Sequence, residues 1–233
     1  MSKTLELLCA GAAQGLVRAL TERWSADTGA TVNARFGAVG AIKELLLAQE
    51  PCDVMVATEA MIDSLVAEGR LQAASRKPLG RVRTGLAVRS GEPRPDVSSP
   101  EALKAALLGA DAIFFPDPVR ATAGIHFANV MRELGIHDAL RPRFRNFPNG
   151  ATSMRELAAT NAPRQIGCTQ ITEINYTDGI ALLGALPDRF ELATVYTAAA
   201  NRHAAQPELA SRFIALLAGP DSLALRTAGG FEF

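Results

Sequence analysis

Apolar and polar positions along the first third of the chain follow a repeating order that predicts strands and helices in turn. Short apolar runs typical of buried strands lie at 5–9, 31–36 and 53–56. Each run precedes a segment whose apolar residues recur every three or four positions, as in an amphipathic helix; these segments are 13–27, 39–49 and 59–68. This order predicts a parallel sheet with helices packed on its faces.

The pattern resumes after a predicted break at 77–80 (KPLG). Two long β-rich runs, 81–89 and 191–200, enclose a second α/β block. Its helices are expected at 102–108, 123–134, 154–159 and 172–175, and its strands at 112–115, 165–169 and 180–183. Helices at 208–217 and from Pro220 onward return to the first block. We therefore expect an α/β fold of two lobes joined by two crossing strands, the first lobe being 1–80 with 195–233 and the second 81–194.

Small residues fill the turns that lead into the first two helices, AGAAQG at 10–15 and FGAVGA at 36–41. The first N–H groups of a helix have no intrahelical partner and lie at the positive end of its dipole, so such turns favour a small anion. We expect backbone donors at Ala12, Ala13, Ala38, Val39 and Gly40, and a side-chain donor at Gln14. The alternative is an ordinary tight turn at each place.

Composition and cysteine usage narrow the class of function. Lys plus Arg balances Asp plus Glu, 24 against 24, so no basic surplus favours nucleic acid or an acidic membrane as partner. Cys9 and Cys52 lie in or beside predicted strands and are expected to be buried and reduced. The sequence has no metal-type spacing, phosphate loop or dinucleotide fingerprint, so neither a metal nor a cofactor is expected.

The start of the chain does not resemble a signal peptide, because Glu6 interrupts a short apolar stretch, and no apolar run approaches the ~18 residues of a membrane span. As written, the chain is expected to be cytoplasmic, without membrane insertion, or periplasmic if a leader was removed.

Polar residues at the helix openings of the second block are further candidates. Arg120 is placed to pair with a carboxylate, and Thr122 to cap the helix or to donate to a ligand. Ser153 and Gln170 lie at the next two helix openings, where capping or packing is the alternative role.

Two residues are candidates for acid–base chemistry, and the catalytic assignment otherwise stays unknown. His126 lies one turn into the helix expected at 123–134. Glu173 follows the end of the strand expected at 165–169. The alternatives are a packed histidine and an ordinary acidic residue in a helix's first turn.

These segments, in this order, resemble the molybdate-binding, type 2 periplasmic solute-binding proteins over essentially the whole chain. The segments that carry the resemblance are AGAAQGL, FGAVGAIKELLLAQEPCDVMVATEAMIDSLVAEGRL, FPDPVRATAGIHFANVMRELGI, QIGCTQITEI, LLGALPDRFELATVYTAAA and LAGPDSLALRTAGGFE. The resemblance implies a small anion held in a cleft between two lobes, with an ABC-transporter membrane component as partner.

Departures from the family pattern change the expected ligand. The family holds a tetrahedral oxyanion with side-chain hydroxyls at places that match Ala12 and Val39, which carry no hydroxyl. Its tyrosine ligand has no clear match, since Gln170 or its neighbours fall near that place. A third small-residue helix opening of the family matches 120–124 here, and it implies that a backbone N–H near Ala123 contacts the ligand. Each lost hydroxyl bond to a charged group corresponds to ~1.5–3 kcal/mol, so molybdate itself is disfavoured.

Aconitate isomerase is a relative on the same scaffold. The leading hypothesis is therefore a solute-binding protein for an oxyanion or small carboxylate, and the alternative is an isomerase of an unsaturated di- or tricarboxylate. A ligand sensor is a third interpretation, which the neutral charge and the lack of a helix-turn-helix pattern disfavour.

Overall fold

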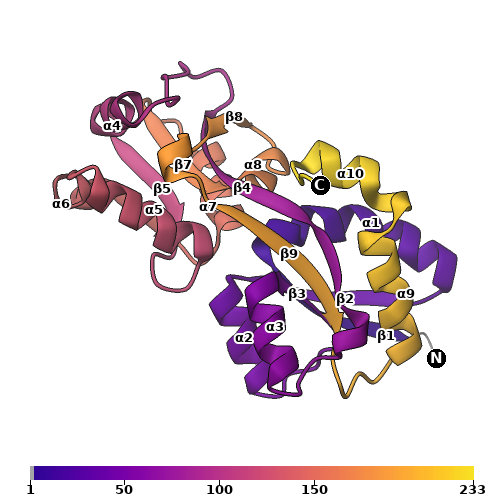
Figure 1. Ribbon diagram of the computed structural model, residues 1–233. Coiled ribbons are helices and arrows are strands. Elements are labelled where there is room, and N and C mark those ends of the chain that lie inside the picture. Colours follow the sequence, from indigo (N-terminus) through magenta and orange to yellow (C-terminus); the bar gives the residue numbers. More distant parts are fainter. Residues whose placement is uncertain (1–2) are drawn as a thin grey trace. The chain divides into compact units, whose positions relative to one another are not determined.

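The computed structural model describes residues 3–233, and the chain divides into two compact units (Figure 1). Unit 1 contains the chain up to Arg81 together with Thr194–Phe233, and unit 2 is Val82–Ala193. The chain leaves unit 1 within strand β4 (Lys77–Arg89) and returns within strand β9 (Ala193–Ala200).

The sheet of unit 1 has the strand order β2-β1-β3-β9. Strands β1 (Thr4–Ala10), β2 (Thr31–Gly37) and β3 (Val54–Thr58) run parallel, and β9 runs antiparallel to β3. The parallel order predicted from the first 70 residues is therefore confirmed.

Helices cover the faces of this sheet. In Figure 1, α2 (Val39–Leu47) and α3 (Glu59–Ala67) lie beside each other, packed against β1 and β3 respectively. Helix α1 (Gln14–Thr28) follows a short 3₁₀ turn, η1 (Gly11–Ala13), and contacts the C-terminal helices α9 (Pro207–Ala218) and α10 (Leu223–Gly229). The Trp24 ring of α1 packs edge-on against Phe213 of α9, with centroids 5.1 Å apart.

The sheet of unit 2 has the order β4-β7-β5-β6, with β8 (Ile180–Ala185) also paired to β4. Strand β5 (Ala112–Pro116) runs parallel to β6 (Phe144–Phe147) and to β7 (Gln165–Gln170), whereas β4 is antiparallel to β7.

Successive side chains of these strands point to opposite faces, which defines two cores. One core contains Leu86, Val88, Ile166 and Cys168 with the side chains of α4 (Pro100–Gly109) and α5 (Thr122–Glu133). The other contains Ala87, Phe114 and the buried side chains of α7 (Gly150–Ala159) and α8 (Ile171–Asn175).

Three expectations about the elements are corrected. The predicted break at 77–80 is wrong, because these residues open β4, and the N–H and carbonyl of Arg81 both pair with Glu232 at 2.8 Å. Helix α7 begins four residues earlier than predicted, since the Asn149 side chain caps it by accepting from the Thr152 N–H at 2.8 Å. Helix α6 (His137–Leu140) and strand β6 were not predicted.

Candidate anion-binding site

Two helices of unit 1 begin at alanine N-caps. Ala38 precedes α2 and Ala13 precedes α1, and a methyl group cannot accept hydrogen bonds from the first-turn N–H groups. By contrast, the Thr58 hydroxyl at the start of α3 accepts from the Met61 N–H at 3.4 Å. The positions predicted as backbone donors in this unit, Ala12, Ala13, Ala38, Val39 and Gly40, thus lie at two helix starts without side-chain caps.

A buried hydroxyl lies at the same edge of the sheet. Ala10 pairs with Gly37, and the register of β1 with β3 brings Ala10 level with Ala57, which pairs with Thr197. Thr197 is 1% exposed, and its hydroxyl finds no hydrogen-bond partner within residues 3–233. Sequence reasoning missed Thr197, because a threonine inside a β-rich run is ordinary strand composition.

The Gln14 side chain is directed toward its own helix. In the amide orientation that satisfies both groups, its carbonyl accepts from the Arg18 guanidinium at 3.2 and 2.9 Å. The Gln14 backbone N–H bonds to Gly11. The side-chain NH₂ is the part of Gln14 that is left for the predicted role as donor.

In unit 2, the N-cap of helix α5 is also an alanine, Ala121. Of the two roles expected for Thr122, the N-cap is therefore wrong, and donation to a ligand stays a prediction. Thr122 is the first helical residue, followed by the predicted contact Ala123. The preceding loop, with the exposed Arg120, is fixed by Asp117, whose carboxylate accepts from the Val119 and Arg120 N–H groups at 2.7 and 3.2 Å.

Gly124 explains how closely this helix start approaches the sheet. A Cβ at this position would overlap the carbonyl oxygens of Pro116 and Asp117 at the end of β5. The first turn of α5 therefore lies directly over the carboxyl end of that strand, where ligands bind in open α/β sheets.

Beside α5 lie two polar side chains that face each other across neighbouring strands. Thr84 of β4 pairs with Gln170 of β7. Each lies two residues from a member of the core beneath α4 and α5, Leu86 and Cys168 respectively, so both side chains point to the α5 face. Gln170 is 2% exposed and Thr84 is 1% exposed. Neither the Thr84 hydroxyl nor either amide atom of Gln170 has a hydrogen-bond partner in the part of the chain that the structure describes.

Thr172 and the predicted ligand residue Ser153 are also fully buried, with hydroxyls that lack a partner among the described residues. Buried polar groups nearly always have a hydrogen-bond partner in folded proteins. The several buried hydroxyl and amide groups of unit 2 that lack a partner among the described residues therefore require an explanation.

A buried carboxyl group, that of Glu173, lies at the start of α7. The Glu173 carboxylate accepts from the Thr169 hydroxyl at 2.5 Å and from the Ala151 N–H at 3.1 Å. A Cβ at Gly150 would overlap both Thr169 and Glu173, so only glycine allows this close approach. Burial raises the pKa of the Glu173 carboxyl above its ordinary value, although these hydrogen bonds oppose the shift. The first-turn N–H groups of Ala151 and Thr152 are thus bonded within the unit.

His126 is half-buried, and its Nε2 donates to the Phe190 carbonyl at 2.8 Å. This bond fixes the ring against the loop before β9, which agrees with the packed alternative. Within residues 3–233, no three His, Cys, Asp or Glu side chains gather as a metal site requires.

The cysteines are free and buried, which confirms the prediction for Cys9 and Cys52. Burial raises the pKa of the Cys52 thiol to about 12, so thiolate chemistry is suppressed there.

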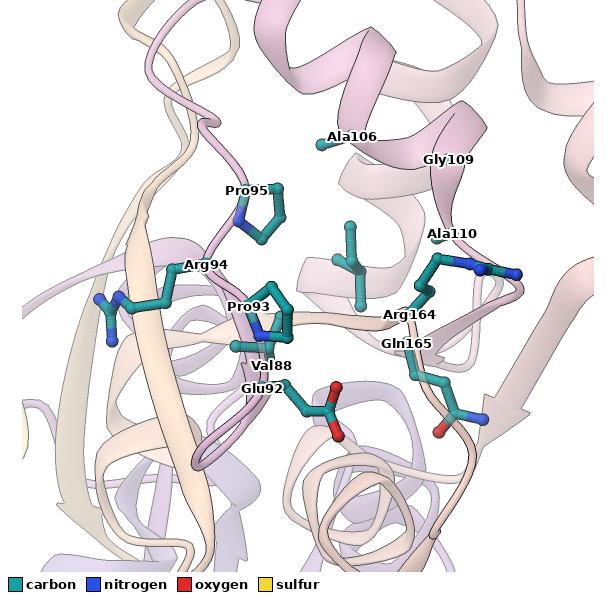
Figure 2. Close-up of a pocket in the computed structure, with 11 residues that line it drawn as sticks. Val88, Glu92, Pro93, Arg94, Pro95, Ala106, Gly109, Ala110, Arg164 and Gln165 are labelled. Carbon is teal, nitrogen blue, oxygen red and sulfur yellow. The ribbon is translucent and has the colours of Figure 1, made fainter.

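Unit 2 contains a cavity of about 300 Å³ that is lined mainly by apolar groups. Figure 2 shows the residues that line it, among them Val88, Pro93 and Pro95. Arg164 and Gln165 border it at the amino end of β7. It therefore lies at the opposite end of this strand from Gln170, and its lining does not suit an anion.

Two α/β units, with β9 antiparallel in the sheet of unit 1 and β4 antiparallel to β7 in unit 2, form a type 2 periplasmic-binding-protein-like fold. The chain belongs to the bacterial extracellular solute-binding protein family, whose model matches residues 5–232. The resemblance stated from the sequence is thereby confirmed.

Particular relatives are an enzyme and two binding proteins. Aconitate isomerase of a Pseudomonas species is 28% identical over 228 residues, which cover 94% of this chain and 84% of that protein. The periplasmic molybdate-binding protein of Azotobacter vinelandii has a TM-score of 0.79 at 20% identity, covering 98% of this chain and 99% of that one. The sulfate-binding protein SubI of Mycobacterium tuberculosis H37Rv has a TM-score of 0.72 at 14% identity, covering 98% and 86%. No helix among residues 3–233 is both long and apolar enough to cross a membrane.

Proposed function

We propose that this protein is a solute-binding protein for a small anion, either an oxyanion or a small carboxylate. The observation that carries the proposal is the combination of helix starts that have no side-chain cap with buried hydroxyl and amide groups that lack partners among the described residues. Family membership supports it. The same proposal includes a compartment outside the cytoplasm and the membrane component of an ABC transporter as partner.

A ligand screen by thermal shift, followed by calorimetry, tests the proposal. Molybdate, tungstate, sulfate, citrate and both aconitates are added to the full chain at constant ionic strength. A ligand that binds the native state stabilises it by ~2.7 kcal/mol at a hundred times its Kd. Stabilisation by at least one anion is expected, and no stabilisation by any of them would contradict the proposal.

A proline substitution tests the helix start itself. Val39→Pro removes the first N–H of α2, and Ala38 already has the extended backbone (φ −63°, ψ 152°) that a following proline requires. We expect about a tenfold loss of affinity, because one hydrogen bond to a charged ligand disappears. Val39→Ala is the control for side-chain shape. Glu59→Pro makes the same change at the side-chain-capped start of α3 and should leave affinity unchanged.

The second candidate function is isomerisation of an unsaturated di- or tricarboxylate, which the similarity to aconitate isomerase favours. Such a reaction moves a proton within an allylic acid and needs a base near the carbon. Glu173 is the candidate, since burial raises the pKa of its carboxyl. Incubation with trans-aconitate, followed by NMR detection of the cis isomer, tests this function. Turnover that is lost in Glu173→Gln while binding persists would support it, and a flat time course would exclude this substrate.

A further inference from the structure

The Gln170 amide is an unusual group for a site that binds a fully deprotonated anion. Such an anion accepts hydrogen bonds and donates none, so N–H and O–H groups are its proper partners. An amide presents an NH₂ donor and a carbonyl acceptor, and whichever way it is turned one acceptor must be satisfied. In Gln170 both atoms are buried and lack a partner within the described chain.

The groups around Gln170 do not provide the missing donor. Thr84 lies directly opposite on β4, yet its hydroxyl makes no hydrogen bond to any of residues 3–233, including the amide. The Thr169 hydroxyl, on the other face of the sheet, donates to Glu173. A donor for the Gln170 carbonyl must therefore come from outside the described residues.

The Gln170 carbonyl lies at the strand end where the anion site is proposed. Extending the β5–β7 register brings Gln170 level with Asp117, immediately before the loop that leads into α5, and α5 packs against β7. Thr84 and Gln170 point to the same face that α5 covers. First-turn N–H groups suited to a carboxylate and an acceptor suited to a hydroxyl thus lie at one edge of one sheet.

We propose that the ligand is a small hydroxycarboxylate and that Gln170 determines this specificity by accepting a hydrogen bond from its hydroxyl group. The inference rests on the proposed function, because it specifies the anion bound at the same site. A site built to pair with a hydroxyl rejects the analogue that lacks it, since the buried carbonyl is then left unpaired. Sulfate and molybdate, which have no donor when fully deprotonated, are rejected for the same reason.

Matched ligand pairs test the proposal by calorimetry on the full chain at pH 7.5. Malate, as both enantiomers, is compared with succinate, and citrate with tricarballylate; each pair has the same carboxylates and differs by one hydroxyl. We expect at least one hydroxy acid to bind about tenfold more tightly than its partner, a difference that corresponds to one unpaired buried acceptor. Sulfate should bind more weakly than that hydroxy acid.

Two variants, each replacing one glutamine of β7, test whether Gln170 causes the preference for the hydroxy acid. Gln170→Met keeps the length of the side chain but removes the acceptor, so the preference within a pair should fall to about twofold or less. Gln165→Met makes the same chemical change at the amino end of β7, beside the cavity of Figure 2, and should keep the full preference.

The outcomes distinguish a failure of this inference from a failure of the proposed function on which it rests. If no anion binds the wild-type chain, the proposed function fails and the inference fails with it. If anions bind but pair members are equal, or sulfate binds more tightly than every hydroxy acid, the inference is overturned while anion binding stands. If Gln170→Met keeps the preference, the assignment to Gln170 is wrong. Should Gln170→Met not fold, the wild-type comparison still decides the ligand class.

Discussion

At the scale of single residues, the Glu173 carboxyl is buried, and the groups that hydrogen-bond to it are donors. Glu173 accepts from the Thr169 hydroxyl and the Ala151 N–H, with Gly150 leaving the space that it needs. Even so, burial outweighs these bonds and raises the pKa of the carboxyl. The native state therefore holds a proton on Glu173 more tightly than the unfolded chain does.

This linkage predicts a pH dependence of stability. Because the folded pKa is raised, the contribution of Glu173 to the free energy of unfolding decreases as the pH rises from about 4.5 toward the folded pKa. Glu173→Gln removes the ionisation and can still accept from Ala151. We expect this variant to melt a few degrees higher than wild type near neutral pH and to lose this part of the pH dependence, as measured by calorimetry between pH 4 and 8.

The matched control is Glu156→Gln, which removes the same charge at an exposed position of α7 and should leave the melting temperature nearly unchanged. If Glu173→Gln instead lowered stability at every pH, the ionised carboxylate would be a net stabilising group, and its hydrogen bonds would outweigh its burial.

At the scale of secondary-structure elements, the candidate site depends on how closely helices approach strand ends. Helix α5 sits on the end of β5 because residue 124 has no Cβ. Gly124→Ala should move the helix start, lower stability by about 1–3 kcal/mol, as overpacking does, and weaken anion binding. Gly109→Ala, at the other end of unit 2, meets no atom within 4 Å and is the matched control.

Denaturant unfolding and calorimetry measure the two effects of Gly124→Ala separately. A variant that unfolds like wild type and binds anions normally would show that α5 tolerates displacement, and the close packing of its first turn would then not matter for binding.

Much of the element order follows from the sequence, because apolar periodicity reports burial directly. The strands and helices of the first 70 residues follow from such patterns, and so do the small-residue turns at Ala12 and Val39. The residues that lie opposite Gln170 and Thr197 on neighbouring strands could not be predicted in this way. Strand register brings Thr84 beside Gln170 and Thr197 beside Ala57, and register depends on contacts between segments far apart in sequence.

At the scale of the whole molecule, unit 1 is assembled from two distant parts of the chain, and a buried arginine ties them together. The Arg226 guanidinium donates to the Leu79 carbonyl at 2.7 Å and to the Ala218 and Gly219 carbonyls at 2.9 Å. Burial lowers the pKa of this guanidinium, but its ordinary value lies so high that the group stays charged. The C-terminal helices thereby belong structurally to the first sheet.

Each unit also contains at least one helix start without a side-chain cap and at least one buried hydroxyl that lacks a partner among residues 3–233, so the response of each unit to ligand can be measured separately. Hydrogen exchange is followed at the first turns of α2 in unit 1 and α5 in unit 2 while the tightest-binding anion is added to a hundred times its Kd. The expected stabilisation of ~2.7 kcal/mol corresponds to a rise in Tm of roughly 5–10 °C for a chain of this size. Amides that bind the ligand should be protected beyond this global effect.

The same molecule supplies the control for this measurement, because Thr58 and Ser99 cap the starts of α3 and α4 by accepting from first-turn N–H groups. Those amides should gain no more protection than the global stabilisation provides. Equal protection at capped and uncapped starts would mean that the ligand binds elsewhere. Extra protection confined to α2 or to α5 would remove the other helix start from the site and leave the anion to one unit.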